Sequence, residues 1–262
     1  MRCTIVGAGI ALFLAQVGVA QTSSTTVEAV QLTVRAKPTI DGVKMFGEPG
    51  VELQLAARVP GKPILAVDGD KSRLVRLVDD QGTDLAKGAP TGFFSWISLS
   101  NAFRDEPTDT CLLDVKTNTL PAAGAGRLEL EAEVALISAS GSVTNEQKVK
   151  LEKGAKVTCG PVPMTLGSVE KSSFGGSALN VQLSSEQRMD AIKSVVFVDA
   201  KGDEIEVQPM GEGSFGFGGK KTYTKSFGLP KKLGEVTVRI TSYAKMETVK
   251  LPVKLSIGMG LR

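Results

Sequence analysis

Histidine is absent from the 262 residues of this chain. A serine or cysteine nucleophile that depends on histidine is therefore excluded, and so is any zinc or iron site with histidine ligands. Cysteine is scarce as well. The chain has three cysteines, which are too few for a four-cysteine zinc site. An enzyme of this composition would have to work with carboxylates, lysine or tyrosine. We expect a non-catalytic protein with no metal and no organic cofactor.

The chain also lacks a strong excess of charge of either sign. It has 31 basic and 28 acidic residues, and its formal net charge is +3. With no long basic block in addition, nucleic acid is not expected as a partner. Beyond the N-terminus no apolar run is long enough to cross a membrane. The hydrophobic share of 42% is that of a globular protein.

The N-terminal segment "MRCTIVGAGIALFLAQVGVA" has the pattern of a secretory signal peptide. Arg2 supplies a short positive region, residues 5–15 are apolar, and the small residues Gly18 and Ala20 precede a cleavage point. A membrane anchor is the alternative, but the apolar run is short for a span. We therefore expect residues 1–20 to be removed and the mature protein to be secreted or periplasmic.

Export bears on the two cysteines that remain, Cys111 and Cys159. Because the compartment is oxidising, we expect them to form a disulfide. Two buried thiols are the alternative, since spacing alone does not determine geometry.

Two segments of the chain resemble each other. "LVRLVDDQGTDL" at 74–85 aligns with "SVVFVDAKGDEI" at 194–205, so that Gly82 matches Gly202. Further matches follow in the same order: "LP" at 120 with 229, "GRLELEA" at 126 with "GEVTVRI" at 234, and "VKL" at 149 with 249. The shrinking offset predicts a tandem duplication whose first copy is the longer one. A repeat of this size is a whole domain.

Both copies show the two-residue periodicity of strands with one buried face. Alternating apolar residues occur at 51–57, 128–136, 179–183 and 249–257. Pro252 cannot donate a ladder hydrogen bond, which predicts an edge strand. Only residues 184–193 look helical, for a turn or two. We predict an all-β protein with two tandem, duplicated immunoglobulin-like β-sandwich domains, at 27–158 and 159–262, after the signal peptide.

The acidic segment "VDAKGDEI" at 198–205 has two interpretations. A calcium loop needs ligands at alternating positions and a terminal bidentate acid, and Asp199 and Asp203 lack that spacing. A hairpin turn needs an aspartate that bonds the backbone two residues on and a glycine with positive φ, here Gly202. We expect the turn.

Two segments are candidates for binding. "EGSFGFGGKK" at 212–221 has P-loop-like glycines, but Gly219 stands where a P-loop has lysine, and no helix pattern follows. We expect an inter-strand loop there. "APTGFFSWISL" at 89–99 carries the single tryptophan, which a sandwich usually buries. Aromatic residues at loop tips can instead contact a sugar or a protein. The candidate binding residues are Phe93, Phe94, Trp96, Phe215 and Phe217.

Part of this pattern resembles chagasin-type cysteine-protease inhibitors, through "PTGFFSW" and "GFGG". The resemblance implies inhibition through two loops, but here the motifs fall in different copies, Ala89 replaces an expected asparagine, and the family's Arg-Pro-aromatic loop is missing. Over most of the mature chain, "DDQGTDL", "KLEKGAKV", "VDAKGDEI" and "GGKKTY" resemble uncharacterised secreted bacterial proteins with paired immunoglobulin-like domains. That resemblance implies no activity.

We therefore expect a binding or structural role at the cell envelope or outside the cell, with a protein or polysaccharide as partner. A protease inhibitor acting through the loops is one alternative. A carboxylate-based glycosidase or lyase is another, although the acidic residues mostly stand in predicted turns.

Overall fold

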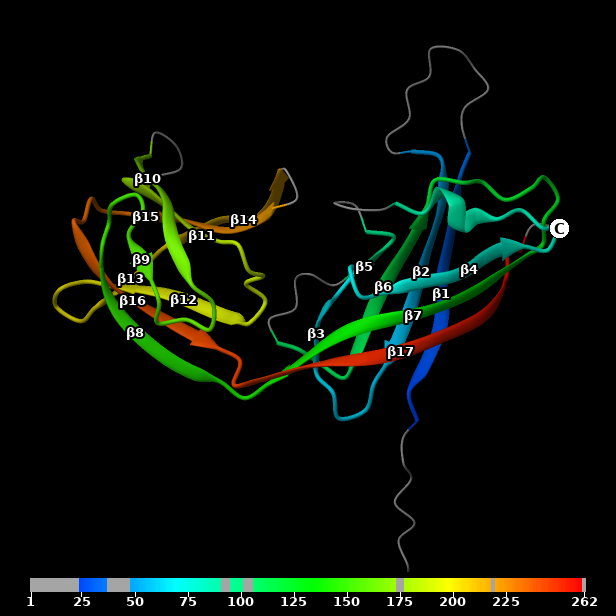
Figure 1. The fold of residues 1–262 in the computed structure, drawn as a ribbon, viewed down its shortest axis with the longest axis horizontal. Coiled ribbons are helices and arrows are strands. Elements are labelled where there is room, and N and C mark those ends of the chain that lie inside the picture. Colours follow the sequence, from blue (N-terminus) through cyan, green and yellow to red (C-terminus); the bar gives the residue numbers. More distant parts are fainter. Residues whose placement is uncertain are drawn as a thin grey trace, which may run out of the picture.

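The computed structural model describes residues 24–36, 48–90, 95–100, 106–172, 177–217 and 220–260. They form two β-sandwiches side by side (Figure 1). The first contains the sheet β1-β2-β6-β5 and a second sheet in which β7 lies between β17 on one side and β3 and β4 on the other. Its strands are β1 (Thr26–Arg35), β2 (Gly50–Arg58), β3 (Ile64–Val67), β4 (Arg73–Asp79), β5 (Ile97–Leu99), β6 (Thr110–Thr117), β7 (Arg127–Ser140) and β17 (Lys245–Gly258).

The second sandwich contains the sheets β14-β15-β11-β10-β9 and β13-β12-β16-β8. Its strands are β8 (Val143–Lys150), β9 (Lys156–Val157), β10 (Met164–Lys171), β11 (Leu179–Ser185), β12 (Ile192–Val198), β13 (Glu204–Ile205), β14 (Gln208–Phe217), β15 (Lys220–Leu229) and β16 (Glu235–Ser242). Among the described residues the one helical turn is the 3-10 segment η1 (Leu85–Gly88). The predicted all-β class is confirmed.

The predicted alternation accounts for the two cores. Along β7 the side chains of Leu128, Leu130 and Val134 are buried, and the acidic residues between them are not. Strands β2 and β11 alternate in the same way. Each sandwich therefore buries the inward face of both its sheets in one continuous apolar cluster.

Strand order identifies both sandwiches as immunoglobulin-like. Constant-type immunoglobulin domains have one sheet in the order A-B-E-D and a second formed by C, F and G. Taking β1, β2, β4, β5, β6, β7 and β17 as strands A to G reproduces that order in the first sandwich. The second sandwich has the same order with β10, β11, β12, β14, β15, β16 and β8.

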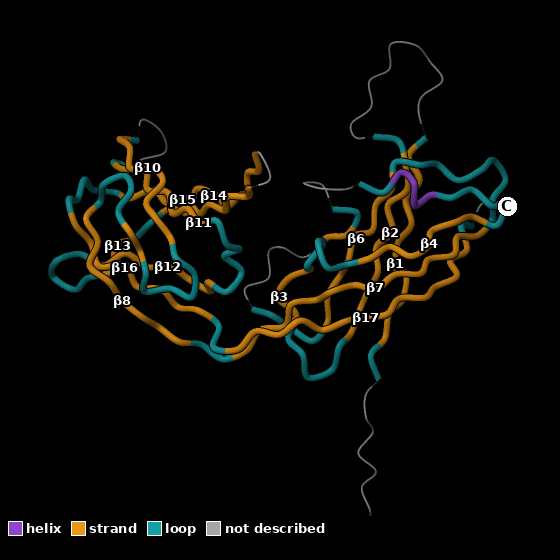
Figure 2. The backbone as a smooth tube through the Cα atoms, in the orientation of Figure 1, coloured by secondary structure: helices purple, strands orange, loops and turns teal. Residues whose placement is uncertain are grey.

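The last strand of each sandwich, however, comes from an unexpected part of the chain. β8 follows β7 directly but pairs with β16, and β17 follows β16 but pairs with β7. The register is continuous, because Ser140 faces Lys245 and Val143 faces Ser242. One long two-stranded ribbon therefore runs through both sandwiches and supplies two strands to each (Figure 2).

This exchange corrects the predicted domain limits of 27–158 and 159–262. The second core takes all its buried residues from positions 149–240, so the second domain begins with β8. The first core includes Leu251, Val253, Ile257 and Met259, so the first domain ends with β17. The second sandwich is thus inserted into the first. β17 is an outermost strand, as Pro252 predicted.

Matching positions of the predicted repeat occupy matching places. Leu77 on β4 faces Leu130, and Phe197 on β12 faces Val238. The "VKL" match, which pairs Val149 with Val249, does not hold. Val149 faces Val236 on β16, and its structural counterpart is Ile257, which faces Leu128 on β7. The two sandwiches therefore share a topology, while duplication as their origin stays a prediction.

The acidic repeat forms the same turn in both sandwiches. Asp199 Oδ1 accepts hydrogen bonds from the backbone N–H groups of Lys201 (2.8 Å) and Asp203 (3.1 Å). Gly202 has φ +92°. Asp79 and Gly82 do the same in the first sandwich, with φ +88° at the glycine. The side chain of Asp199 thus shapes a turn, as expected.

Two other predictions are wrong. Residues 184–193 are not helical: β11 runs to Ser185, whose hydroxyl accepts a hydrogen bond from Gln187 and donates one to Pro163, and a turn follows. The Cys111–Cys159 disulfide is not formed. Cys111 is buried in the first core, opposite Ala57, whereas Cys159 packs against the second core.

The predicted signal peptide, residues 1–20, lies outside the described residues. In the part of the chain that is described, no helix is long and apolar enough to cross a membrane.

Candidate functional site

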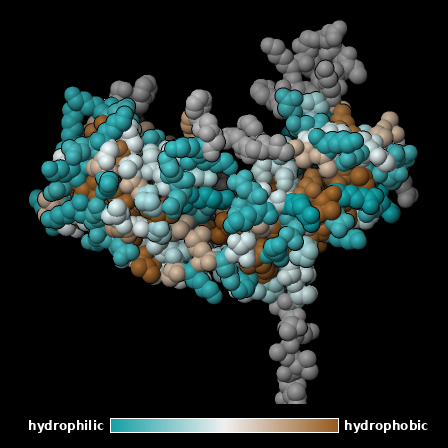
Figure 3. Space-filling model, in the orientation of Figure 1, coloured by the Kyte–Doolittle hydropathy of each residue, from teal (hydrophilic) through white to brown (hydrophobic). Residues whose placement is uncertain are grey.

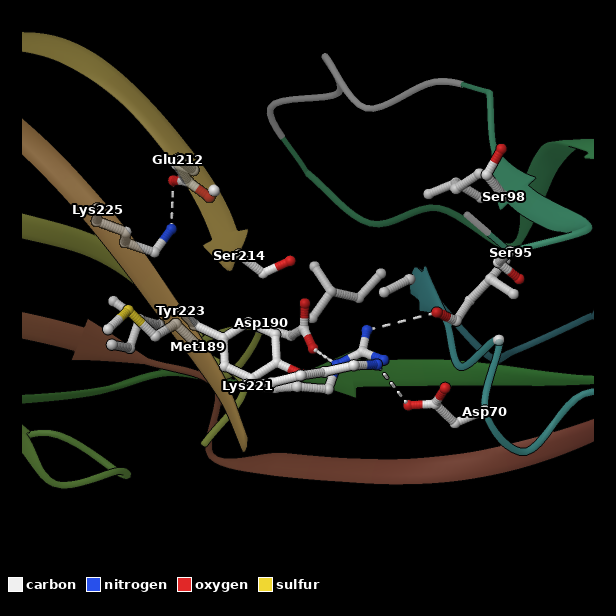
Figure 4. Close-up of a pocket in the computed structure, with 18 of the residues that line it drawn as sticks. Asp70, Ser95, Ser98, Met189, Asp190, Glu212, Ser214, Lys221, Tyr223 and Lys225 are labelled. Carbon is white, nitrogen blue, oxygen red and sulfur yellow. Dashed lines mark hydrogen bonds and ion pairs between the residues drawn. The ribbon is translucent and has the colours of Figure 1, made fainter. Parts of the chain in front are cut away.

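A cleft of about 700 Å³ lies between the two sandwiches and takes its lining from both (Figure 4). Pockets of this volume accommodate small ligands or short segments of a partner, and they occur preferentially at domain interfaces. The face seen in Figure 3 is mixed: hydrophilic residues cover much of both sandwiches, and groups of hydrophobic residues lie among them. Both tyrosines of the chain, Tyr223 and Tyr243, line the cleft.

One wall is the end of the β14–β15 hairpin. Cross-strand pairing places Glu212 opposite Lys225 and Ser214 opposite Tyr223, so these four side chains share one face. Lys225 forms an ion pair with Glu212. Further along β15 the same face packs on the second core, through Phe227. The face of the hairpin that packs on the core therefore becomes polar toward the hairpin end, where it lines the cleft.

The base of the cleft comes from the turn between β11 and β12. Met189 and Ile192 are buried in the second core and anchor this segment. The residues between and beside these anchors cannot enter the core as well, so Arg188, Asp190 and Lys193 project into the cleft. From the first sandwich, residues 65–67, Gly69 and Asp70 complete the base.

Ion pairs cross the cleft between the sandwiches. The guanidinium of Arg188 lies 3.7 Å from a carboxylate oxygen of Asp68, which is 7% exposed, and also pairs with Asp190. Lys221 Nζ lies 3.3 Å from Asp70. Burial lowers the pKa of Arg188, but the two carboxylates more than offset this and raise it. Arg188 therefore stays charged and links the domains.

A third ion pair joins the two sandwiches beside the cleft, where Lys193 is one of the lining residues. Lys193 Nζ lies 2.6 Å from Glu106 Oε1, and this hydrogen bond raises the pKa of Lys193. Burial and the nearby Glu106 raise the pKa of Tyr243, which is therefore a neutral hydroxyl at physiological pH. The cleft thus offers hydroxyl groups between paired charges.

The opposite wall is β5 with the residues just before it. Trp96 and Ile97 point into the first core and are 8% and 2% exposed. Ser95 and Ser98 face the cleft instead (Figure 4). Since the inward residues are fixed by the core, the serines are held in place.

The sequence-predicted binding residues have mixed outcomes. Phe93 and Phe94 lie outside the described residues. Trp96 is a buried residue of the first core, as the usual place of a tryptophan in a sandwich suggests, and is not a binding residue at a loop tip. Phe215 is 69% exposed on β14, and the backbone of Phe217 ends that strand, but its side chain is outside the description.

The glycine-rich segment is not the loop that we expected. Residues 212–217 belong to β14, and β15 begins at Lys220. The two candidate segments of the sequence nevertheless converge, because Ser95 and Ser98 face Glu212 and Ser214 across the cleft. Sequence reasoning missed Arg188 and Tyr243. Only the run of charges around Met189 could have pointed to Arg188.

The carboxylates of the cleft are engaged in ion pairs: Asp70 with Lys221, Asp190 with Arg188 and Glu212 with Lys225. Among the described residues, no group of three or more cysteines, aspartates or glutamates is arranged to hold a metal ion. The cleft can therefore donate and accept hydrogen bonds through its own hydroxyl and backbone groups.

Comparison of the chain with protein-family models, with curated proteins and with solved structures gave no match.

Proposed function

We propose that this protein is an exported, non-catalytic binding protein that holds a protein or polysaccharide partner in the cleft between its two immunoglobulin-like sandwiches. The observation that carries the proposal is the cleft itself, a polar cavity of about 700 Å³ lined from both domains. Function in such folds belongs to the surfaces between and beyond the strands, because the strands are committed to packing.

The ion pairs of the cleft carboxylates favour binding over hydrolysis. A glycosidase needs one carboxyl group that holds a proton and a second one at a defined distance. Here each cleft carboxylate contacts a cation, and the pairs of Asp68 and Asp70 join one domain to the other. These charges therefore position the two walls of the cleft.

The protease-inhibitor alternative has one observation in its favour, since residues 97–99 and 212–214 line the same cleft. Titration of a papain-type protease with the mature protein tests it. Stoichiometric loss of protease activity would replace the present proposal.

A cleft-filling substitution tests the proposed function. In Ser214→Trp the indole would occupy the cleft. Thr165→Trp on β10 is the control, because Thr165 is exposed and does not line the cleft. We expect a glycan array or cross-linking to secreted proteins to yield a partner that wild type and Thr165→Trp retain and Ser214→Trp loses. Equal retention by all three proteins would rule out the cleft as the binding site.

A further inference from the structure

Strand β14 is an outermost strand that lines the cleft, and its outer edge has no partner among the described strands. Such an edge presents a row of backbone N–H and C=O groups that another strand can bind. Proteins usually protect long edges with charges, proline, bulges, short length or a covering segment. Whether β14 is protected can be judged against the other edges of the same molecule.

Four other edge strands, β17, β8, β1 and β5, are protected or short. β17 has Pro252 in its middle and lysines at 245, 250 and 254. β8 carries charged residues, and the side chain of Gln147 on it bonds the backbone of Thr158. β1 contacts β17. β5, the equivalent of β14 in the first sandwich, is three residues long.

β14 differs from all of these. It spans ten residues, and in its last seven, Gly211–Phe217, the only charge is Glu212, which Lys225 neutralises. Its two devices, Pro209 and a bulge between Pro209 and Gly211, both lie near the start of the strand. The rest of the edge is open to a partner strand.

Two glycines on β14 have no internal explanation. A Cβ at Gly213 would come no closer than 3.7 Å to its nearest neighbour, and one at Gly216 no closer than 3.6 Å, which are ordinary contacts. Neither has a positive φ. Glycine weakens a strand interior, and it often marks a place where another backbone approaches closely. The fold of this chain tolerates larger residues at both positions, so an external strand is a reason for their absence.

We infer that the partner in the cleft is an extended polypeptide segment that adds as a strand to the free edge of β14. The inference rests on the proposed function and names its ligand class. Side chains of an added strand alternate between two faces. One face of β14 carries Glu212 and Ser214, and the other carries Phe215, which is 69% exposed. The complementary segment therefore alternates polar residues with apolar residues that cover Phe215.

The space favours a single segment over a second copy of this chain. A single added strand needs about 4.8 Å of space beside β14 in the hydrogen-bonding direction. A second copy of the protein would bring a whole sandwich, whose two sheets are about 10 Å apart. A cleft of about 700 Å³ has room for the former.

The test uses the mature protein and random twelve-residue peptides displayed on phage. The selected peptide is synthesised and its Kd is measured by calorimetry, then measured again with each backbone amide N-methylated in turn. Strand addition predicts loss of affinity at every second position, by roughly tenfold, and little change between them. Failure to select a peptide, or an N-methylation profile without alternation, would overturn the inference.

Variants locate the peptide. Gly213→Val should leave the stability of the protein unchanged or higher, because valine favours strands, yet weaken binding roughly tenfold. Phe215→Lys should weaken binding to a similar extent. Val30→Lys is the control: Val30 is 49% exposed on β1, also an outermost strand. Binding that is unaffected by both β14 variants would contradict the inference.

Two outcomes separate this inference from the proposed function. If Ser214→Trp abolishes binding of the natural partner but the β14 variants do not, the cleft binds and strand addition is wrong. If light scattering shows a dimer that Phe215→Lys dissociates, a second copy occupies the edge, and the inference is again overturned.

Discussion

At the scale of single residues, Asp79 is the clearest case of a polar group that the fold requires. Its carboxylate is 3% exposed and accepts backbone hydrogen bonds from Gln81, Thr83 and Ala122, at 3.0, 2.7 and 2.7 Å. The bond from Ala122 ties the turn to the segment before β7. Asp199, its counterpart, accepts the two bonds of the turn.

This difference predicts unequal effects of the same substitution. Asp79→Asn should place an amide N–H₂ against a backbone donor, and should lower the free energy of unfolding by about 1–3 kcal/mol. Asp199→Asn should lower the free energy of unfolding clearly less. Both turn bonds go to Oδ1 of Asp199, so the amide nitrogen can take the place of Oδ2, where no backbone donor lies. Urea denaturation of both variants measures this. An equal loss of stability would mean that the bond from Ala122 contributes nothing.

The same residue predicts a pH dependence. Burial raises the pKa of Asp79, but its hydrogen bonds with Ala122, Thr83 and Gln81 outweigh burial and bring the pKa below its ordinary value of 3.8. Because the pKa is lower in the folded state, the stabilisation is complete above pH 3.8 and is lost as the pH falls through the folded pKa. Unfolding free energies between pH 2 and 7 should therefore decline less steeply for Asp79→Asn than for wild type. Parallel curves would contradict this.

At the scale of elements, the turn after β12 tests the role of backbone conformation. Gly202 and Gly234 both have open space where a Cβ would lie, but only Gly202 has a positive φ, +92°. Gly202→Ala should therefore destabilise the protein by about 1–2 kcal/mol, whereas Gly234→Ala should be neutral or slightly stabilising. Thermal unfolding of the two variants compares them directly. A neutral Gly202→Ala would show that the turn adapts at no cost.

The exchanged strands predict which fragment folds alone. A fragment of residues 142–243 contains the seven principal strands of the second sandwich and its whole core. It should unfold cooperatively and keep a β-type circular dichroism spectrum. A fragment of residues 159–262 lacks both β8 and β7, the strand with which β17 pairs along its whole length, so it should not fold. Cooperative unfolding of this second fragment would show that β17 can replace β8.

At the scale of the whole molecule, the ribbon and the ion pairs set the width of the cleft. Two short breaks, at residues 141–142 and 243–244, separate the parts of the ribbon that belong to each sandwich. The pairs of Asp68 with Arg188, Asp70 with Lys221 and Glu106 with Lys193 hold the sandwiches together on the cleft side. Charges of this kind are screened by salt.

We therefore expect the cleft to widen at high ionic strength. The radius of gyration from small-angle X-ray scattering should rise between low salt and 1 M salt, where the screening length is about 3 Å. Asp68→Asn combined with Glu106→Gln should reproduce the wider state at low salt. Glu133→Gln, which breaks a pair with Lys250 within the first sandwich, is the control. Superimposable scattering curves for all conditions would contradict the prediction.

Local features of the sequence determined the strands and the turns. Alternation in β2, β7, β11 and β17 is visible in the residues themselves, because each strand must place its apolar side chains on one face. The aspartate–glycine turns are equally local, since only nearby backbone groups and a positive φ are involved. From these features the all-β class and the immunoglobulin-like sandwich could be predicted.

Only the tertiary structure decided how the two sandwiches share the chain and where the cleft lies. β8 could have paired with β7 as a hairpin, because both β7 and β16 offer an edge with the same alternation. No local signal distinguishes these partners, so the domain limits could not be read from the sequence. The disulfide prediction failed for the same reason, since it joined residues of separate cores. The cleft joins Ser98 on β5 with Ser214 on β14, and only the packing of the sandwiches brings such distant residues together.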